Sequence, residues 1–198
     1  IQPNNLYNKG LKQFSLFGYK GLPLIAISGL DMAYWDALSK AENQPLAAFL
    51  GGSMNPIPAY NSNGLGLTNH LTALASEAEE LVLDGNFEMV KVRLGRETLK
   101  QDLEAFRAVR AAVGKDILLP VDFNQGLDTE EALIRGRALD MEDVYWIEEA
   151  IVYDNLDGYA RLTKELKTPI QIGENFHGPK DSSDAVAARA CVYSMPDL

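Results

Sequence analysis

The stretch Ile117-Leu118-Leu119-Pro120-Val121-Asp122-Phe123 is apolar on both of its faces until it reaches its end. A strand with one solvated face would carry a polar residue at every second position. This pattern is instead typical of a strand that is buried on both sides. Such strands belong to parallel sheets covered by helices, so the stretch predicts an α/β fold.

Short β-like runs and helical stretches of 10–17 residues alternate on both sides of this stretch. The runs are 57–62, 89–94, 117–123, 144–148, 169–174 and 191–196, and the helical stretches are 69–83, 97–113, 129–139, 156–166 and 181–190. This alternation predicts βα units around a parallel sheet. Six units fit either a doubly wound open sheet or most of a (β/α)8 barrel, which needs roughly 250 residues. We therefore expect a partial (β/α)8 TIM-type barrel with about six strands, either truncated or part of a longer chain.

The first fifty residues have a different pattern. Residues 1–20 are weakly patterned, and Gly10 and Gly18 are expected to break any helix there. Apolar residues three to four apart over 22–50 predict helices, with Pro45 between one helix and the next. We therefore expect a helical segment at 1–50 and the barrel segment at 51–198.

Composition narrows the class of protein. The 198 residues include 18 Lys and Arg and 28 Asp and Glu, a formal net charge of −10, with 46% hydrophobic and 23% charged residues. These values are typical of a globular domain and exclude a disordered chain, and the acidity argues against nucleic-acid or membrane partners. The single cysteine, Cys191, excludes a disulfide framework and a cysteine-based zinc site. The sequence contains neither a recognisable secretory signal nor an apolar run long enough to cross a membrane, so we expect a soluble, cytoplasmic protein. Because the sequence starts with Ile1 and not with Met, we also expect that the true N-terminus is missing.

Three carboxylates follow the apolar runs at a constant spacing. Asp122, Glu148 and Glu174 are separated by 148 − 122 = 26 and 174 − 148 = 26 residues, one βα unit each time. Equal spacing predicts one common height at the strand ends, where parallel βα folds carry their active sites. Carboxylates that meet there repel unless a cation lies between them, and oxygen ligands select Mg²⁺ or Mn²⁺. Alternatively, each acid is solvated or caps the next helix, and Glu149 competes with Glu148.

Two basic residues end the run at 89–94. Lys91 and Arg93 are two residues apart, so strand alternation places both on one face, towards the barrel axis. A Lys in such a place can lose its proton and act as a base, whereas Arg stays protonated. The alternative is a strand end that faces solvent.

Short motifs follow one another in a set order: Lys91-Val-Arg93, Val121-Asp-Phe-Asn-Gln125, Trp146-Ile-Glu-Glu149, Gly173-Glu-Asn175 and Met195-Pro-Asp197. Together with the helical stretch from Gly29 to Leu38, they resemble the enolase superfamily, specifically the mandelate racemase-like subgroup. The resemblance covers residues from about 19 to 198. It implies an α+β capping domain and a modified (β/α)8 barrel. Residues 1–50 would then be the C-terminal helical part of the capping domain with its linker, and 51–198 an incomplete barrel.

The resemblance also implies chemistry, namely Mg²⁺-assisted removal of the proton α to a carboxylate to give an enediolate. By resemblance, the metal ligands for Mg²⁺, with Mn²⁺ as an alternative, are Asp122, Glu148 and Glu174. Lys91 resembles the first Lys of a Lys-x-Lys motif and Asp197 the acid of a His–Asp dyad, so the catalytic candidates are Lys91, Arg93 and Asp197. The substrate-binding candidates are Ser62, Asn124 and Asn175. By resemblance, Ser62 and Asn124 stand at substrate-contacting positions of the family, and Asn175 directly follows the third metal ligand.

Two features depart from the family pattern. Arg93 stands where a second Lys, a base, is usual, and the dyad His is expected beyond Leu198. The family pattern requires neither His70, at a helix start, nor His177, in the loop after Glu174.

These departures bear on the reaction. A racemase needs a proton acceptor on each face of the α-carbon, whereas dehydration needs one base and one acid, which a single dyad can supply. We therefore favour a lyase that dehydrates an acid sugar or related 2-hydroxy acid, with a 2-hydroxy-acid racemase or epimerase as the alternative. A Schiff-base aldolase that uses Lys91, or a non-catalytic metal-binding remnant, stays open. The expected partner is a small-molecule carboxylate, and a homo-oligomer is compatible with the acidic surface.

Overall fold

Five short parallel strands form the sheet in a computed structural model of the protein, which describes residues 3–197. Neighbouring strands follow chain order: β1 (Val92–Arg93), β2 (Val121–Asp122), β3 (Ile147–Glu148), β4 (Ile170–Ile172) and β5 (Tyr193–Ser194). An isolated parallel bridge pairs Asn61 with Val90. The six predicted runs thus appear as five strands and one bridge, and the parallel α/β architecture of a partial barrel is confirmed.

The register of the sheet separates apolar from polar side chains. One row of paired positions is Val92, Val121, Ile147 and Ile170. The next row is Arg93, Asp122, Glu148, Gln171 and Tyr193. Successive residues of a strand point to opposite faces. The apolar row therefore packs into the hydrophobic core, and the polar row faces the other way, into the barrel interior.

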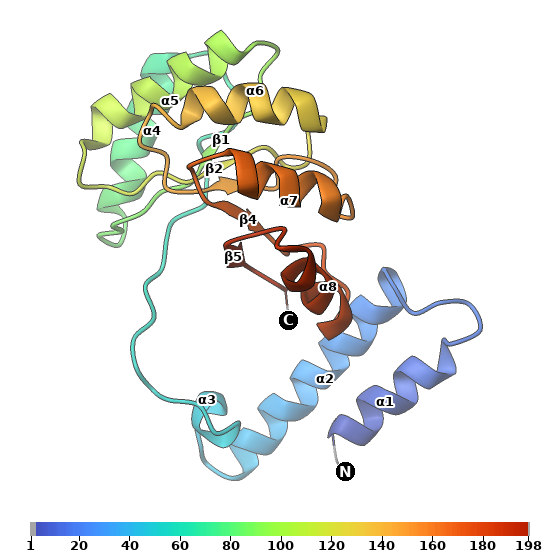
Figure 1. Ribbon diagram of the computed structural model, residues 1–198. Helices are drawn as coiled ribbons and strands as arrows, with labels where there is room; N and C mark the ends of the chain where they lie inside the picture. The colour runs from blue at the N-terminus through green and yellow to red at the C-terminus, as the bar shows by residue number, and fades with distance from the viewer. Residues whose placement is uncertain (1–2, 198) are drawn as a thin grey trace. The chain divides into compact units, whose positions relative to one another are not determined.

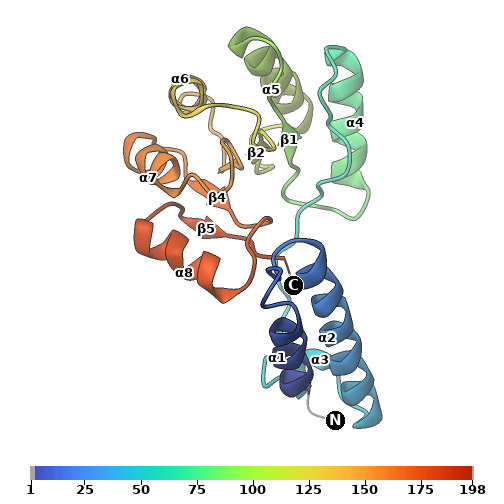
Figure 2. The same cartoon turned by 90° about the vertical axis from the view of Figure 1, so that its right-hand side faces the viewer.

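Helices cover the outer face of the sheet. They are α4 (Leu71–Leu83), α5 (Leu99–Val113), α6 (Thr129–Leu139), α7 (Leu156–Glu165) and α8 (Pro179–Ala188). Figure 2 shows α5 to α8 arranged in an arc outside the strands, and Figure 1 shows the same units from a second side. The bounds of α6 equal the predicted ones, and the other four differ from their predictions by one or two residues.

Side-chain caps define where three of these helices begin. Thr98 and Gln101 form a capping box at α5, in which the Gln101 side chain accepts the Thr98 N–H at 3.0 Å and the Thr98 hydroxyl accepts the Gln101 N–H at 3.3 Å. The Asp128 and Asn155 side chains accept the N–H groups of Glu131 and Gly158, in the first turns of α6 and α7. The caps thereby fix the ends of the loops that follow β1, β2 and β3.

The chain divides into two compact units, one that extends to Ile57 and one from Pro58 to Asp197. The first contains three helices: α1 (Pro3–Gln13), α2 (Leu22–Ala41) and α3 (Leu46–Phe49). Pro45 lies between α2 and α3, as the sequence predicts. The outer ends of the two predicted segments, residues 1, 2 and 198, lie outside the described residues. Within residues 3–197, no helix has both the length and the apolar character to cross a membrane.

The predicted break at Gly10 is wrong, because α1 continues through this residue. Gly10 lies against Ile27 of α2, where an added Cβ would be 3.2 Å from the Ile27 side chain. Glycine at this position allows the two helices to pack closely, and this packing outweighs the cost of glycine within a helix. Gly18, with a φ of 83°, does lie outside any helix, as predicted.

Candidate active site at the carboxyl ends of the strands

Lys91 joins two of the strand-end carboxylates. Its Nζ lies 3.0 Å from Asp122 Oδ2 and 2.6 Å from Glu148 Oε1. The Lys91 side chain is 7% exposed and both acidic side chains are fully buried. Asp122 and Glu148 are paired in register, so these two lie at one height, as predicted. An ammonium group between them supplies the positive charge that two neighbouring buried carboxylates need.

Arg93 adds a second cation beside Asp122. Its Nη1 donates to Asp122 Oδ2 at 3.2 Å and to Asn124 Oδ1 at 2.6 Å. Asn124 has a φ of 45°, which turns the chain back so that its own N–H and Nδ2 donate to Asp122 at 2.8 and 3.0 Å. Lys91, Arg93 and Asn124 therefore surround one carboxylate.

Glu174 does not share the register row of the other two acids. The residue opposite Glu148 is Gln171, and Glu174 follows it by three positions in the turn after β4. The predicted common height is therefore wrong for Glu174, because the strand ends before it. Glu174 remains within electrostatic reach of the site: burial and then the charge of Asp122 raise its pKa, while Lys91 lowers it.

The two groups at the centre of the site have shifted pKa values. Burial raises the pKa of Glu148, and the charge of Asp122 adds to this effect, against the hydrogen bond from Lys91. Burial alone would lower the pKa of Lys91, but the hydrogen bonds and charges of Glu148 and Asp122 outweigh burial, so that this pKa lies above its ordinary value. Lys91 is thus a charged ammonium group here, and not the neutral base that a lysine in such a place can become.

Three further predicted residues lie at strand ends. Ser62 is exposed and directly follows Asn61 of the isolated bridge. Asn175 follows Glu174 in the turn after β4 and is half-buried. Asp197 is exposed beyond β5, and its charge contributes to the raised pKa of Glu174. The roles assigned to Ser62, Asn175 and Asp197 stay predictions.

The two histidines have different places. His70 is the exposed N-cap residue of α4, as its position at a helix start predicts. His177 lies in the loop between β4 and α8, where its N–H donates to Asp181 Oδ2 at 2.9 Å and its ring centroid is 6.4 Å from that of Tyr153. These contacts indicate no chemical role for His177.

Three residues of the site were not predicted from the sequence. Trp146 Nε1 donates to Glu148 Oε2 at 3.1 Å, and strand alternation backwards from Glu148 would have found it. Tyr60 packs edge-on against Trp146 with centroids 5.6 Å apart. Gln171 is buried in the polar row, and neither amide atom has a hydrogen-bond partner within residues 3–197. Its signal was a single polar residue between two isoleucines.

Whether a divalent cation suits these residues depends on the donor atoms. Within residues 3–197, no three acidic, histidine or cysteine side chains converge into a ready metal cluster. The Lys91 ammonium lies between Asp122 and Glu148. The donors themselves are carboxylate oxygens, which suit Mg²⁺. Burial, and then the charge of Asp122, raise the pKa values of Glu148 and Glu174, so a cation beside these carboxylates would stabilise their charged forms. The residues therefore fit a divalent cation, provided that Lys91 releases one of its ion pairs.

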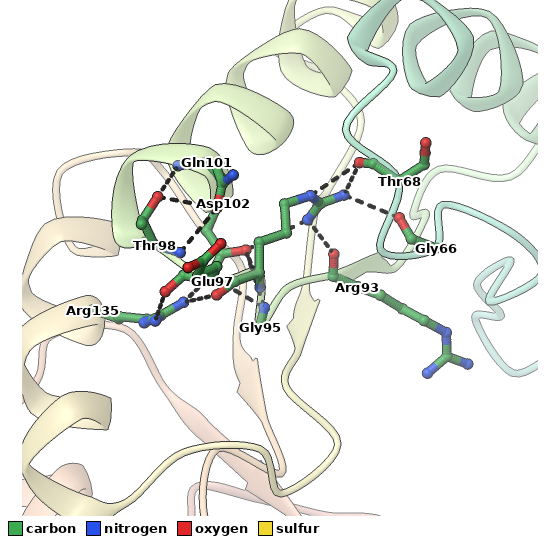
Figure 3. Close-up of polar contacts among 10 residues, drawn as sticks. Gly66, Thr68, Arg93, Gly95, Glu97, Thr98, Gln101, Asp102 and Arg135 are labelled. Atoms are coloured by element: carbon green, nitrogen blue, oxygen red, sulfur yellow. Dashed lines mark hydrogen bonds and ion pairs between the residues drawn. The ribbon is translucent and has the colours of Figure 1, made fainter.

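A second buried charge cluster lies beside the loop after β1 (Figure 3). Asp102 of α5 is 1% exposed, and its carboxylate accepts the N–H groups of Gly95 and Arg96, each at 3.0 Å. Arg135 of α6 donates to the same carboxylate at 2.6 Å. These contacts join the loop after β1 to α5 and α6.

The Arg96 guanidinium extends this second cluster towards the site. It lies 3.5 Å from Asp102 and donates to the carbonyl groups of Gly66, Thr68 and Arg93 at 2.8–3.1 Å. Figure 3 shows the Arg93 side chain pointing away from this cluster. The second cluster thus holds the backbone of Arg93 while the side chain of Arg93 is free to reach Asp122.

Two family models match the chain. One, described as the mandelate racemase / muconate lactonizing enzyme N-terminal domain, matches residues 5–51. The other, described as enolase C-terminal domain-like, matches residues 73–198.

Individual relatives agree with this assignment. An arabinonate dehydratase of Saccharolobus solfataricus is 34% identical over 165 residues, which are 83% of this chain and 44% of the relative. A solved enolase from alpha pretobacterium bal199 with bound Mg is 49% identical with a TM-score of 0.95, over 99% of this chain and 55% of that one. An enolase from Bradyrhizobium, complexed with magnesium and mandelic acid, is 38% identical with a TM-score of 0.92. The match covers 99% of this chain and 54% of that one.

The other curated relatives include dehydratases, cycloisomerases and a racemase. The chain spans about half the length of the curated relatives it matches. The order of strand-end residues, the parallel sheet and both family matches agree, and the chain belongs to the mandelate racemase/muconate lactonizing enzyme family of the enolase superfamily.

Proposed function

We propose that the complete protein is a Mg²⁺-dependent acid-sugar dehydratase, which removes the α-proton of a sugar acid and eliminates its β-hydroxyl as water. The observation that carries this choice is Arg93 beside Lys91, bonded to Asp122 and Asn124. Because Arg stays protonated, it binds an anion but takes no proton. One face of the substrate then lacks a base, which suits elimination better than two-base racemisation. The arabinonate dehydratase among the relatives supports the same class.

The acidic residues are proposed to hold the metal and the basic ones the substrate. Asp122, Glu148 and Glu174 would be the ligands of Mg²⁺, which when bound supplies positive charge to the substrate carboxylate. Lys91 and Arg93 place two fixed cations where negative charge develops as the α-proton leaves. The raised pKa of Lys91 supports this role, because it keeps the ammonium charged at neutral pH.

The remaining proposed roles concern proton transfer and substrate contact. Asp197 would orient the His of a His–Asp dyad, which we expect on a later strand and which would act as both base and acid. Ser62, Asn124 and Asn175 are proposed to contact the polyhydroxy chain of the substrate. Asn124 is the best placed of these, because it already contacts Arg93 and Asp122.

Proton NMR in D₂O tests the assignment of bases on the complete protein. The substrates are pairs of sugar acids that differ only at the α-carbon, such as arabinonate and ribonate. We expect exchange or elimination of the α-proton from one member of a pair only. Arg93→Lys introduces an amine that can lose its proton, so this variant should also exchange the other member. Exchange from both members at comparable rates by the wild type would contradict the proposal and favour a racemase.

Mg²⁺ titration by calorimetry tests the metal site. Glu174→Gln removes one charged ligand, so its Mg²⁺ affinity should fall by more than the roughly 10–100-fold that loss of an outer contact produces. Glu79→Gln, on an exposed position of α4, is the matched control and should bind as the wild type does. Equal affinities of wild type and Glu174→Gln would refute the site.

Lys91 is poorly suited to Schiff-base chemistry. That reaction needs a neutral amine, whereas Lys91 forms two ion pairs that raise its pKa. Borohydride in the presence of 2-oxo acids should therefore leave no adduct on Lys91, as mass spectrometry of the digested protein would show.

The proposed domain assignment keeps residues 1–50 as part of the capping domain with its linker and 51–198 as the incomplete barrel. The match of the N-terminal family model to residues 5–51 and the unit boundary after Ile57 support this assignment. We also propose a cytoplasmic location for the complete protein.

A further inference from the structure

Glu149 is a buried acid outside the proposed set of metal ligands. It is 1% exposed, although it directly follows Glu148. Its Oε1 accepts the N–H of Gly173 at 3.0 Å, while Oε2 has no hydrogen-bond partner among the described residues. Burial of a carboxylate costs free energy, so a specific interaction must explain why one lies here.

The main chain at Glu149 explains why the N–H of Gly173 needs a side chain as its hydrogen-bond acceptor. The Glu149 N–H donates to the Gln171 carbonyl at 3.1 Å, which continues the pairing of β3 with β4. In a regular parallel ladder, the Glu149 carbonyl would next accept the N–H of Gly173. However, Glu149 has a φ of 42°, and its carbonyl accepts the Gln125 N–H at 2.6 Å instead. The Glu149 carboxylate therefore takes the place of its own carbonyl as the acceptor.

Gly173 is the point from which Glu174 leaves the sheet. Its φ is 143°, and a Cβ there would lie 2.8 Å from the backbone of Met195. The turn that begins at Gly173 is closed by the Phe176 N–H, which donates to the Gly173 carbonyl at 2.9 Å. Because the peptide of Gly173 is held on both sides, its orientation decides where the Glu174 side chain starts.

We propose that Glu149 is a positioning residue, whose carboxylate holds the Gly173 N–H and thereby directs Glu174 towards Asp122 and Lys91. Glu149 acts through Gly173 and touches neither metal nor substrate. The inference rests on the proposed function only where Glu174 is taken as a metal ligand. It explains why two successive acids are needed at the end of β3: Glu148 faces Lys91, and Glu149 holds the next strand end.

Calorimetric titration of the complete protein with Mg²⁺ alone tests the proposal. Glu149→Leu has a similar volume but no acceptor, so its Mg²⁺ affinity should fall roughly 10–100-fold. Glu149→Gln keeps an acceptor oxygen for Gly173 and should bind Mg²⁺ as the wild type does. This rescue by the amide separates hydrogen-bond positioning from a requirement for charge.

Leu133→Ala is the control for general destabilisation. It creates a cavity under α6 without touching the turn, so it should lower the melting temperature but leave Mg²⁺ affinity unchanged. Wild-type affinity in Glu149→Leu, or an equal loss in Glu149→Gln, would overturn the proposal. If Glu149→Leu does not fold, Glu149→Asp replaces it: its carboxylate is one methylene too short, and the same loss is expected.

Glu174→Gln in the same titration separates the positioning role of Glu149 from the role of Glu174 as a metal ligand. If Glu174→Gln loses affinity and Glu149→Leu does not, only the positioning role fails. If Glu174→Gln binds as the wild type does, the metal assignment of the proposed function fails, and the positioning role fails with it.

Discussion

Two buried charge clusters lie on either side of the end of β1, and they differ in how their charges balance. Around Asp102, two guanidinium groups and two backbone N–H groups meet one carboxylate. Around Lys91, the ammonium meets two carboxylates, and Arg93 and Glu174 add one charge of each sign nearby. One cluster thus has more donors than its carboxylate needs, and the other has an excess of acid.

The difference separates a structural role from a chemical one. The cluster around Asp102 uses its charges to close a loop, since its arginines also bond backbone carbonyl groups. The cluster around Lys91 holds acids whose pKa values are raised, so the fold keeps them at a cost in free energy. Such a cost is typical of a site that gains stability only when a ligand binds.

The largest effect should follow from removal of the Asp102 carboxylate. Asp102→Ala leaves the buried Arg96 and Arg135 guanidinium groups without their shared acid. Loss of one partner from a buried ion pair costs about 3–5 kcal/mol, so the unfolding free energy of the complete protein should fall by this amount. Urea denaturation followed by circular dichroism measures it. Asp116→Ala, at an exposed aspartate, is the control and should change stability by less than about 0.5 kcal/mol.

A loss under about 1 kcal/mol in Asp102→Ala, similar to an exposed salt bridge, would mean that water or a rearranged Glu131 replaces the carboxylate. The contrast between the two clusters would then be wrong.

The positions of the acids at the strand ends could be predicted from the sequence more accurately than the contacts that these acids make in the fold. Asp122 and Glu148 follow from apolar strands of regular spacing, and their pairing in register confirms that inference. The height of Glu174 could not follow from spacing, because the turn at Gly173 ends the strand early. The choice between Glu148 and Glu149 depends on the register of β3, which places Glu148 opposite Asp122 and beside Lys91. Alternation along the strand could not make that choice, because both acids are buried.

For the cluster around Asp102, the local pattern indicates burial of the charged residues but not their pairing. Asp102 and Arg135 are 33 residues apart on different helices. Helical spacing puts each on the buried face of its helix, Asp102 with Ala105 and Phe106, and Arg135 with Ala132 and Leu139, but it does not say which charged residue becomes the partner. Only the close approach of α5, α6 and the loop after β1 brings them together. Long-range pairing of this kind is set by tertiary packing, not by periodicity.

A smaller effect of opposite sign is expected at Glu174. Its pKa is raised in the fold, so its charged form at pH 7 is less favourable there than in the unfolded chain. In EDTA, Glu174→Gln should therefore raise the unfolding free energy by a few tenths up to about 1 kcal/mol. Saturating Mg²⁺ should reverse the order, because only the wild type then gains stability from tight binding. Destabilisation of the variant in EDTA would show that Glu174 is a structural acid like Asp102.

The smallest effect concerns Cys191, where the effect of burial on a pKa can be measured separately from the effect of neighbouring charges. Burial is the cause that raises the pKa of the Cys191 thiol. In contrast, the pKa values of Glu148 and Glu174 depend on neighbouring charges as well as on burial. A raised pKa means that the neutral thiol persists to higher pH, so less reactive thiolate is present at pH 8 than in an unstructured cysteine peptide. The rate of reaction with a disulfide reagent, measured from pH 7 to 10, should reach its midpoint at higher pH in the protein than in the peptide. Steric shielding alone would lower the rate at every pH without moving the midpoint, and a midpoint at or below that of the peptide would contradict the claim that burial by itself suppresses ionisation in this barrel.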